Sequence, residues 1–295
     1  MRKRKELPEK IYATTCGYLI IILTLSIVFF IAYKGVAIFN QNGVSISEFL
    51  SSSKWAPENA IENGGPKVGA LIFYTGSIMV SLFAVILSTP LSVSVAIFMT
   101  EISPTLGNKV LRPAIELFVG IPSVVYGWIG LSLLVPFIRA NLGGLGFSIL
   151  SGGIVLTIMI MPTIVSIAVD SLKNQPIDYK EASLSLGATR WQTIRKILLP
   201  SAMPGILTGV VLGLARAFGE ALAVQMVIGN RVSLPKSILD PAITLTSIIT
   251  MDMGNTVQGS VWNNALWSMA FVLLLIFFGF ILIIREISHY ANRGE

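Results

Sequence analysis

Residues 179–200 read YKEASLSLGATRWQTIRKILLP, a mixed polar and apolar stretch between two long apolar runs. Thr189 followed by Gln192 has the spacing of a capping box, in which two side chains satisfy free amides at a helix start. Gly187, just before this pattern, suits the left-handed backbone that ends a helix. The stretch therefore predicts two short helices joined by a glycine turn.

The first of these helices has a similar start. Asp178 and Glu181 repeat the capping-box spacing, with aspartate in place of serine or threonine, and predict a helix from Tyr179. Apolar residues recur at three- and four-residue steps through both helices. They are Leu184, Ala188, Trp191, Ile194 and Leu198. Such a stripe needs a covering surface, from this chain or from another.

The composition indicates a membrane protein. Of the 295 residues, 54% are hydrophobic and 12% are charged, with a mean hydropathy of +0.78, whereas soluble domains carry about 25% charged residues. Six apolar stretches are long enough to cross a hydrocarbon core of about 30 Å as helices. The predicted fold class is therefore all-α integral membrane with six transmembrane helices. The predicted spans are 13–33, 70–99, 113–138, 150–172, 204–227 and 264–286.

Basic residues orient these spans. With the N-terminus inside, the inner segments hold 14 of the 21 lysines and arginines, the outer segments hold 6, and Arg216 lies within a span. This asymmetry predicts cytoplasmic termini and places residues 179–200 in an inner loop. The net charge of +6 then indicates contact with anionic membrane lipids and not with nucleic acid. The short tethers to the flanking spans also disfavour docking of the loop into a DNA major groove. An amphipathic loop resting on headgroups is the simplest alternative.

The reactive side chains argue against an enzyme. The chain has one cysteine, Cys16, and one histidine, so it offers no cysteine metal site and no Ser/His/Asp or Cys/His set. No stretch has the form GxxxxGKS/T of a phosphate-binding loop, so we do not expect ATP hydrolysis by this chain. We expect no catalytic residue, metal or bound cofactor.

The fifth predicted span holds two opposite charges. Arg216 is eleven residues from Gly205, roughly 16 Å along a helix and hence near the membrane midplane. Glu220 lies one turn further on the same face. A structural ion pair that locks the bundle is one interpretation. The other is a gated cationic site in which Glu220 holds Arg216 until an anion competes, since the planar fork of arginine suits a tetrahedral oxyanion.

Small residues at every fourth position of the same span predict close packing with another helix. They are Gly205, Gly209, Gly213, Ala217 and Ala221.

The third predicted span contains helix breakers. Gly120, Pro122, Gly127 and Gly130 lie within eleven residues. At membrane depth such residues are tolerated where the freed backbone lines a cavity or meets another helix. Ser123 and the amides near it are then candidates to solvate an anion. Plain close packing explains the glycines equally well.

The spacing in the inner loop also carries a family resemblance. Residues 181–183 (EAS), three residues, Gly187, nine residues and residues 197–200 (ILLP) resemble the EAA motif of ABC importer permeases. That pattern is E-A-A, three residues, G, nine residues, I-x-L-P, and only Ser183 departs from it, where alanine is usual. The resemblance implies that the loop 173–203 holds a coupling helix that docks into a separate ATPase. The residues it implies at this contact are Glu181, Ala182, Ser183, Gly187 and Arg190.

A narrower resemblance rests on the third and fifth spans. GIPSVVYGWIGL at 120–131 and RAFGEALAVQMVIGN at 216–230 resemble the PstC-type membrane subunits of phosphate-specific (Pst) ABC importers, over about residues 70–290. The resemblance implies a five-helix permease core at 70–290. Residues 1–69 would supply a cytoplasmic N-terminus, one further span and an external loop. In that family the charged pair of the fifth span is implicated in phosphate passage, which carries over to Arg216 and Glu220.

The same resemblance implies partners and a location. The partners are a PstA-like permease subunit, two PstB-like ATPase subunits that bind ATP and Mg²⁺, and a PstS-like external phosphate-binding protein, at a bacterial cell membrane. A permease of the same class for sulfate or molybdate is an alternative, because Arg216 distinguishes charge better than identity. A stand-alone secondary anion carrier is a third reading, but it would leave the EAA-like loop unexplained.

Overall fold

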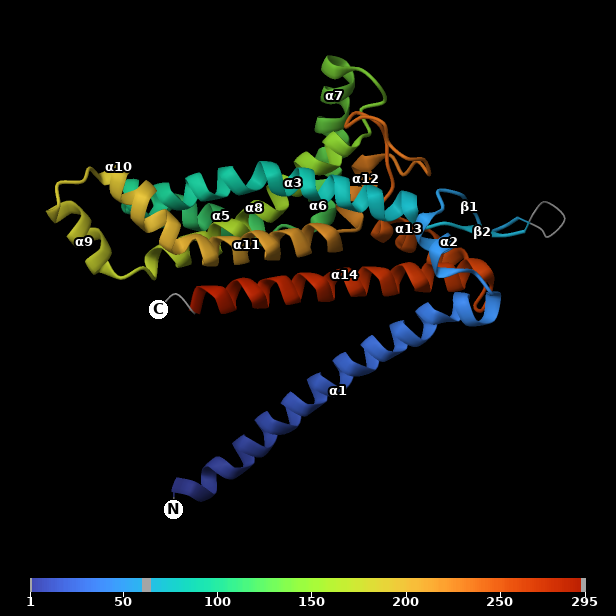
Figure 1. Ribbon diagram of the computed structural model, residues 1–295, viewed down its shortest axis with the longest axis horizontal. Coiled ribbons are helices and arrows are strands. Elements are labelled where there is room, and N and C mark those ends of the chain that lie inside the picture. Colours follow the sequence, from blue (N-terminus) through green and yellow to red (C-terminus); the bar gives the residue numbers. More distant parts are fainter. Residues whose placement is uncertain (1, 60–64, 293–295) are drawn as a thin grey trace.

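Long helices that run roughly side by side give the molecule an elongated shape (Figure 1). The computed structural model describes the backbone of residues 2–59 and 65–292, and the side chains of residues 10–59 and 65–287. Its two short strands, β1 (Trp55–Ala56) and β2 (Lys67–Val68), pair antiparallel at one end of the molecule. Everything that positions the candidate site is helical.

The helices are α1 (Arg2–Asn42), α2 (Ile46–Ser51), α3 (Leu71–Ile97), α4 (Pro104–Leu106), α5 (Arg112–Gly120), α6 (Ser123–Ile129), α7 (Val135–Leu142), α8 (Ile149–Lys173), α9 (Ile177–Ser185), α10 (Arg190–Thr193), α11 (Leu199–Gly219), α12 (Leu222–Ile228), α13 (Leu245–Asp252) and α14 (Val261–Asn292). The π-helical turns η2 (Phe98–Ile102), η3 (Gly107–Leu111), η4 (Gly130–Leu134) and η5 (Ile194–Leu198), together with the 3-10 turn η6 (Met253–Asn255), extend or join them.

Six helical stretches in the described part of the chain are long and apolar enough to cross a membrane, which confirms the predicted number. The third starts at Ser123 and not at 113, and the fifth ends at Gly219 and not at 227. Both predicted spans were wrong at these ends because each contains a break in the helix. The six stretches are Lys10–Asn42, Leu71–Ile102, Ser123–Leu142, Ile149–Lys173, Arg190–Gly219 and Val261–Ile287.

Helices α3, α8 and α11 pack against one another at the centre of the bundle. The small-residue stripe of α11 faces α8, as the sequence predicts. A methyl group added to Gly205 would lie 2.2 Å from Ser171 Oγ, and one added to Gly213 would lie 2.8 Å from an Ile164 side-chain carbon. The two helix backbones therefore approach closely, which favours van der Waals packing where the surroundings are as apolar as the side chains.

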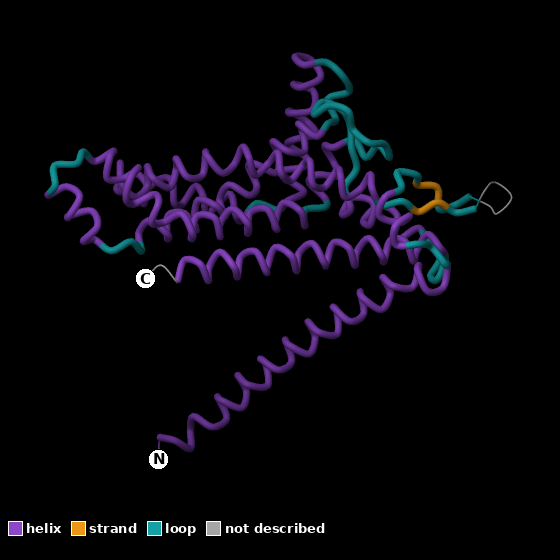
Figure 2. The backbone as a smooth tube through the Cα atoms, viewed as in Figure 1, coloured by secondary structure: helices purple, strands orange, loops and turns teal. Residues whose placement is uncertain are grey.

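Helix α14 connects the first span to this core. On one side it packs on α11, where Phe218 and Phe280 form an edge-to-face pair with ring centroids 5.3 Å apart. On the other side Phe271 lies against Gly35 of α1, and Ser268 Oγ donates to the Gly35 carbonyl at 2.6 Å. Towards the N-terminus α1 diverges from the bundle, as Figure 2 shows, and its side chains at 10–27 are exposed.

One end of the bundle is closed by a core cluster that joins α1, α2, α3, α13 and α14. The Leu245 amide of α13 donates to Ser77 Oγ at 2.9 Å, and Gly76 of α3 leaves room for the Ile243 carbonyl. Helix α13 therefore lies against the second turn of α3, inside the bundle. Burial raises the pKa of the Asp252 carboxyl at the end of α13.

The opposite end carries α9 and α10, and both ends of the described chain lie towards that end of the long axis (Figure 1). An even number of crossings brings the two ends to one side. Next to α10 a further core cluster contains Ile194 and Leu198 of η5 together with Ala96 at the end of α3 and Met99 in its extension η2. The loop between α8 and α11 is thus anchored on one side by buried apolar contacts.

The contact between α3 and α13 generates a test. We expect Gly76→Ala to lower the free energy of unfolding by about 1–3 kcal/mol, because its methyl group would lie 2.1 Å from the Ile243 carbonyl oxygen and backbone would have to move. Thermal unfolding in detergent measures this. Gly17→Ala on the exposed part of α1, where a methyl group meets nothing within 4 Å, is the control and should not destabilise. Equal midpoints for the two variants would contradict the close approach.

Candidate functional site

The loop between α8 and α11 begins with a proline-led helix. Pro176, with φ −54° and ψ 132°, is the N-cap residue of α9, so the helix starts at Ile177. Asp178 lies in the first turn and makes no capping hydrogen bond. The predicted capping box at Asp178 was therefore wrong. Pro176 has an extended backbone and helical residues follow it at once, so α9 begins two residues earlier than the acidic pattern indicates.

Gly187 ends this helix as predicted. Its φ is +82°, in the left-handed region. The Gly187 amide donates to the Leu184 carbonyl at 3.0 Å, and the Ala188 amide donates to the Ser183 carbonyl at 3.2 Å. These two bonds are the pair that defines a Schellman motif. The turn is therefore hydrogen-bonded internally, and its direction depends on a backbone conformation that glycine adopts without strain.

The second helix start is also confirmed. Gln192 Oε1 accepts from the Thr189 amide at 2.8 Å, and Thr189 Oγ1 accepts from the Gln192 amide at 3.3 Å, which completes the capping box of α10. The chain continues from α10 through the π-helical turn η5 directly into α11. Any displacement of α10 is thus passed to the fifth span through continuous helix.

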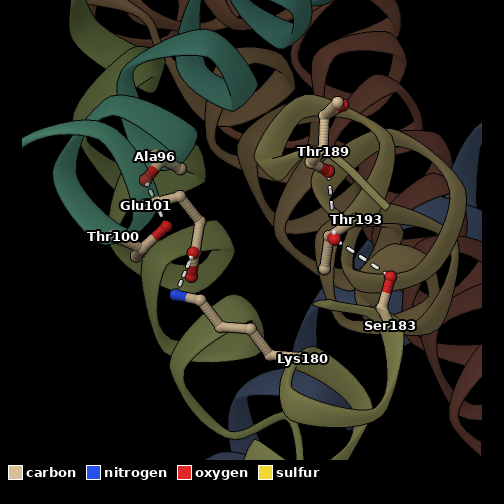
Figure 3. Close-up of polar contacts among 7 residues, drawn as sticks. All are labelled: Ala96, Thr100, Glu101, Lys180, Ser183, Thr189 and Thr193. Atoms are coloured by element: carbon tan, nitrogen blue, oxygen red, sulfur yellow. Dashed lines mark hydrogen bonds and ion pairs between the residues drawn. The ribbon is translucent and has the colours of Figure 1, made fainter. Parts of the chain in front are cut away.

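Ser183 joins the two loop helices. Its hydroxyl is 2.9 Å from Thr193 Oγ1, and the Thr193 hydroxyl also donates to the Thr189 carbonyl at 3.2 Å (Figure 3). Ser183 and Thr193 are both buried. The residue that departs from the EAA pattern therefore supplies a hydrogen bond that alanine could not, and it fastens α9 to α10 as one unit.

The predicted apolar stripe divides between two surfaces. Ile194 and Leu198 are buried in the core, whereas Leu184 and Trp191 are exposed, Trp191 to 58%. Three more apolar residues on α9 and the turn are exposed, namely Ile177, Tyr179 and Leu186. The charged residues Asp178, Glu181 and Arg190 are exposed on the same two helices. The α9–α10 unit therefore presents a mixed apolar and charged surface to the outside at the end of the molecule.

In the fifth span, Arg216 lies in the last turn of α11. Its Nη1 donates to Thr163 Oγ1 of α8 at 2.9 Å. The expected pair with Glu220 is not formed, because among the described residues the ion pairs are Arg112–Glu116 and Lys180–Glu101. Sequence reasoning missed Thr163, because α8 holds several other hydroxyl residues and nothing in the sequence singles this one out.

The Glu220 side chain has a different role. Its backbone is extended, with φ −73° and ψ 126°, so α11 ends at Gly219 and Glu220 does not continue the helical face. The Glu220 carboxylate accepts from the Ala223 amide at 3.2 Å at the start of α12, and its carbonyl accepts from Thr246 Oγ1 of α13 at 2.8 Å. The Glu220 carbonyl and the Ala223 amide, which have no partner along the helix axis at the break, thus find partners inside the bundle, and these bonds stabilise the break.

The third span is broken at Ile121 and Pro122, between α5 and α6, as its helix breakers predict. Tyr126 Oη donates to the Phe118 carbonyl at 2.7 Å, across the break. Ser123 is the first residue of α6 and is half-buried, and no hydrogen bond joins it to Arg216 in the part of the chain that the structure describes.

The two broken spans meet each other. A methyl group added to Gly127 of α6 would lie 2.9 Å from the Ala223 Cα of α12 and 2.8 Å from Met226 Sδ. Helix α6 also packs along α12. The helices that follow the two breaks are therefore in contact inside the bundle, and Arg216 lies about one turn before the second break. Within residues 10–59 and 65–287, no group of His, Cys, Asp and Glu could hold a metal ion.

Six apolar helical stretches, two of them adjoining breaks inside the bundle, and a loop of two hydrogen-bonded helices at one end are the features expected of the membrane permease of an ATP-binding-cassette transport system. The chain belongs to the family of binding-protein-dependent transport system inner membrane components, whose model matches residues 88–289. Permeases of this family are transport components, not enzymes, and work with another permease and an ATPase subunit.

Relatives of known name support this assignment. The chain is 52% identical over 288 residues to the "Probable ABC transporter permease protein YqgH" of Bacillus subtilis (strain 168), covering 97% of this chain and 92% of the relative. It is 34% identical over 306 residues to the "Phosphate transport system permease protein PstC" of Xylella fastidiosa (strain 9a5c), covering 97% and 91%. An inward-facing structure of the MetNI methionine ABC transporter matches with a TM-score of 0.53 at 23% identity, over 72% of this chain and 91% of that chain. This last likeness confirms the fold alone.

The hydrogen bond between α9 and α10 can be tested by a double-mutant cycle. We expect Ser183→Ala and Thr193→Val each to lower the free energy of unfolding by about 1 kcal/mol, and the double variant to lose less than the sum, because one shared bond is lost. Denaturant unfolding in detergent measures the three differences. Ser185→Ala, whose exposed hydroxyl bonds only its own helix at the Glu181 carbonyl, is the control. Strictly additive losses would show that the two hydroxyls do not interact.

Proposed function

We propose that this chain is a PstC-like permease subunit of an ATP-driven phosphate importer. The observation that carries the proposal is Arg216, a cation in the last turn of a broken span, held by a hydroxyl from a second span. Support comes from relatives named as phosphate transport permeases that match the chain over most of its length. A permease of the same class for sulfate or molybdate is the second candidate, since a tetrahedral oxyanion of either kind fits the same donors.

The chemistry of the proposed path follows from the donors near Arg216. A guanidinium has five N–H donors, and one of those of Arg216 donates to Thr163. Because the Thr163 hydroxyl accepts that bond, its own O–H is available to donate to an anion oxygen. No carboxylate of the described residues lies within 4 Å of Arg216, so a phosphate would not need to displace one. Ser123, at the start of α6, is proposed as a further donor on the path.

Glu220 enters the proposal in a changed role. A carboxylate that caps α12 stabilises the break and keeps the helix ends apart, which is what a discontinuous path requires. It acts on the path through the backbone, and not as a counter-ion that releases Arg216. The gated ion pair is therefore not part of the proposed mechanism.

We propose the α9–α10 unit as the docking element for a separate ATPase. Its outward face combines exposed Leu184, Leu186 and Trp191 with the charges of Glu181 and Arg190. Because α9 and α10 are joined to each other by a hydrogen bond, a movement of the bound ATPase would displace them together and would be passed to the flanking spans α8 and α11. ATP and Mg²⁺ would bind on that ATPase, and this chain would hold neither.

The remaining partners and the orientation belong to the same proposal. We expect a PstA-like permease subunit beside this chain, two PstB-like ATPases against the α9–α10 end, and a PstS-like phosphate-binding protein at the opposite end. Both ends of the described chain lie towards the α9–α10 end (Figure 1). Together with the excess of basic residues on that side, this supports cytoplasmic termini in a bacterial cell membrane.

Substitutions at Arg216 test the substrate path. In proteoliposomes that hold the complete complex, Arg216→Ala should lower phosphate uptake roughly 10- to 100-fold, because a charge-assisted bond to the anion is lost. Arg216→Lys keeps the charge without the planar fork and should recover part of the loss. Thr163→Val, which keeps the shape and removes the hydroxyl, should raise the KM for phosphate more than it lowers the maximal rate.

The matched control is Arg139→Ala, on the exposed last turn of α7, which should transport normally. Competition by sulfate and molybdate in the same vesicles separates the two candidate substrates. Normal phosphate uptake by an assembled Arg216→Ala complex would contradict the assigned path.

Substitutions at Gly187 test the docking element. A side chain there meets nothing within 4 Å, so any effect arises from the backbone, whose φ of +82° excludes proline and strains alanine. Gly187→Ala should cost about 1–2 kcal/mol at the turn, and Gly187→Asn less, because asparagine tolerates the left-handed region. Co-purification of the ATPase and substrate-stimulated ATP hydrolysis should fall in the order Gly, Asn, Ala, Pro. Full ATPase binding and stimulation with Gly187→Pro would exclude this loop as the docking element.

A further inference from the structure

Besides the Ser183–Thr193 hydrogen bond inside the α9–α10 unit, an ion pair connects this unit to the end of α3. Lys180 of α9 reaches across to Glu101 in η2, the extension of α3, with 2.6 Å between Nζ and Oε2 (Figure 3). The Glu101 side chain is 12% exposed and that of Lys180 is 42% exposed. The acidic partner is thus largely shielded from water, unlike the other ion pair of the described residues, Arg112–Glu116, whose side chains are 62% and 69% exposed.

The local backbone positions Glu101 for this contact. Helix α3 does not end as an α-helix, because the Ser103 amide donates to the Phe98 carbonyl at 2.9 Å and closes a π-helical turn. Thr100 Oγ1 donates to the Ala96 carbonyl at 3.0 Å on the same turn (Figure 3). A π-turn holds an extra residue, so it changes the face on which the following side chains lie. Such turns are frequent at functional sites.

Apolar packing joins the end of α3 to η5, through Ile194 and Leu198, but that core cluster holds no residue of α9. A cavity of about 270 Å³ lies between η2 and the α9–α10 unit, lined among others by Glu101, Pro104, Lys180, Arg190 and Thr193. Helix α9 packs instead on α10 and η5. The contact between α9 and the end of α3 therefore depends on the Lys180–Glu101 ion pair, which crosses an incompletely filled space.

The α9–α10 unit thus has three routes into the membrane. It joins α8 through residues 174–176, and it joins α11 through η5, both along the chain. Among the side-chain polar contacts of the described residues, its route to α3 is the Lys180–Glu101 ion pair. We propose that Lys180 and Glu101 are positioning residues that pass the movement of the docking element to α3. This inference rests on the proposed docking of an ATPase to α9–α10, but not on the identity of the substrate.

The test uses the complete complex of both permeases, two ATPases and the binding protein in proteoliposomes. Glu101→Gln keeps the size of the side chain and removes the negative charge that pairs with Lys180. We expect about a fivefold fall in the ratio of phosphate imported to ATP hydrolysed, within the range of site-to-site coupling in proteins. Lys180→Gln should behave alike, and Glu101→Lys combined with Lys180→Glu should restore much of the ratio that Glu101→Lys alone loses.

Glu116→Gln is the matched control, since it removes the exposed pair with Arg112 and should leave the ratio unchanged. The yield and thermal stability of the assembled complex are measured on every variant. A normal ratio in Glu101→Gln overturns the proposal. So does a fall in uptake that only follows a fall in assembled complex, because the pair is then a fold contact, and so does a failure of the exchanged pair to restore the ratio.

A wrong assignment of the substrate can be distinguished from a wrong assignment of the ion pair. If the wild-type complex does not import inorganic phosphate, the substrate is wrong. The ion pair is then judged by the ATPase rate of the assembled complex relative to the ATPase alone, which needs no substrate. Glu101→Gln should bring that rate closer to the rate of the free ATPase, and an unchanged rate overturns the proposal.

Discussion

A helix that is interrupted inside an apolar bundle leaves amides and carbonyls without partners, and lipid offers none. This constraint governs where the two broken spans can lie. The Phe118 carbonyl is met by Tyr126 Oη, the Glu220 carbonyl by Thr246 Oγ1, and the Ala223 amide by the Glu220 carboxylate. Two of these bonds are made within the same span, and the third comes from Thr246 of α13. Because lipid could not replace them, both breaks lie inside the bundle, and α13 packs against the second one. The position of Arg216 beside this irregular backbone follows from the same requirement.

Much of the architecture could be predicted because its causes are local. Apolar runs mark the spans, glycines at every fourth position mark the face of α11 that meets α8, and Gly187 marks a left-handed turn. The break at Glu220 could not be predicted in this way. Phenylalanine, glutamate, alanine and leucine around it are compatible with a helix, and Gly219 does not mark the break either, because Gly205, Gly209 and Gly213 lie inside the same helix. The bond that meets the Glu220 carbonyl at the break comes from Thr246, which lies 26 residues further along the chain. Tertiary contacts of this kind leave no periodic trace in the sequence.

The functional elements also divide into those set by neighbouring residues and those set by contacts between distant parts of the chain. Capping by Thr189 and Gln192 is contained in four consecutive residues and was predictable, whereas the start of α9 was set by Pro176 against the acidic pattern. Thr163 and Glu101 lie 53 and 79 residues from their partners, so no spacing rule connects them. Ser183 is intermediate, because the EAA pattern marks its position and only the structure shows what its hydroxyl contributes. Sequence thus locates the docking element, and structure shows how it is fastened.

The attachment of α1 has a mechanical consequence. Contacts hold this helix to α14 from Asn42, which accepts from Asn264, to Phe30, whose ring packs edge to face on Trp267. The side chains at 10–27 beyond these contacts are exposed. From Phe30 to Lys10 the helix extends about 30 Å, so a tilt of about 5° at Phe30 would move the backbone at Lys10 by about 3 Å. A small rotation of α14 would therefore be enlarged along the first span.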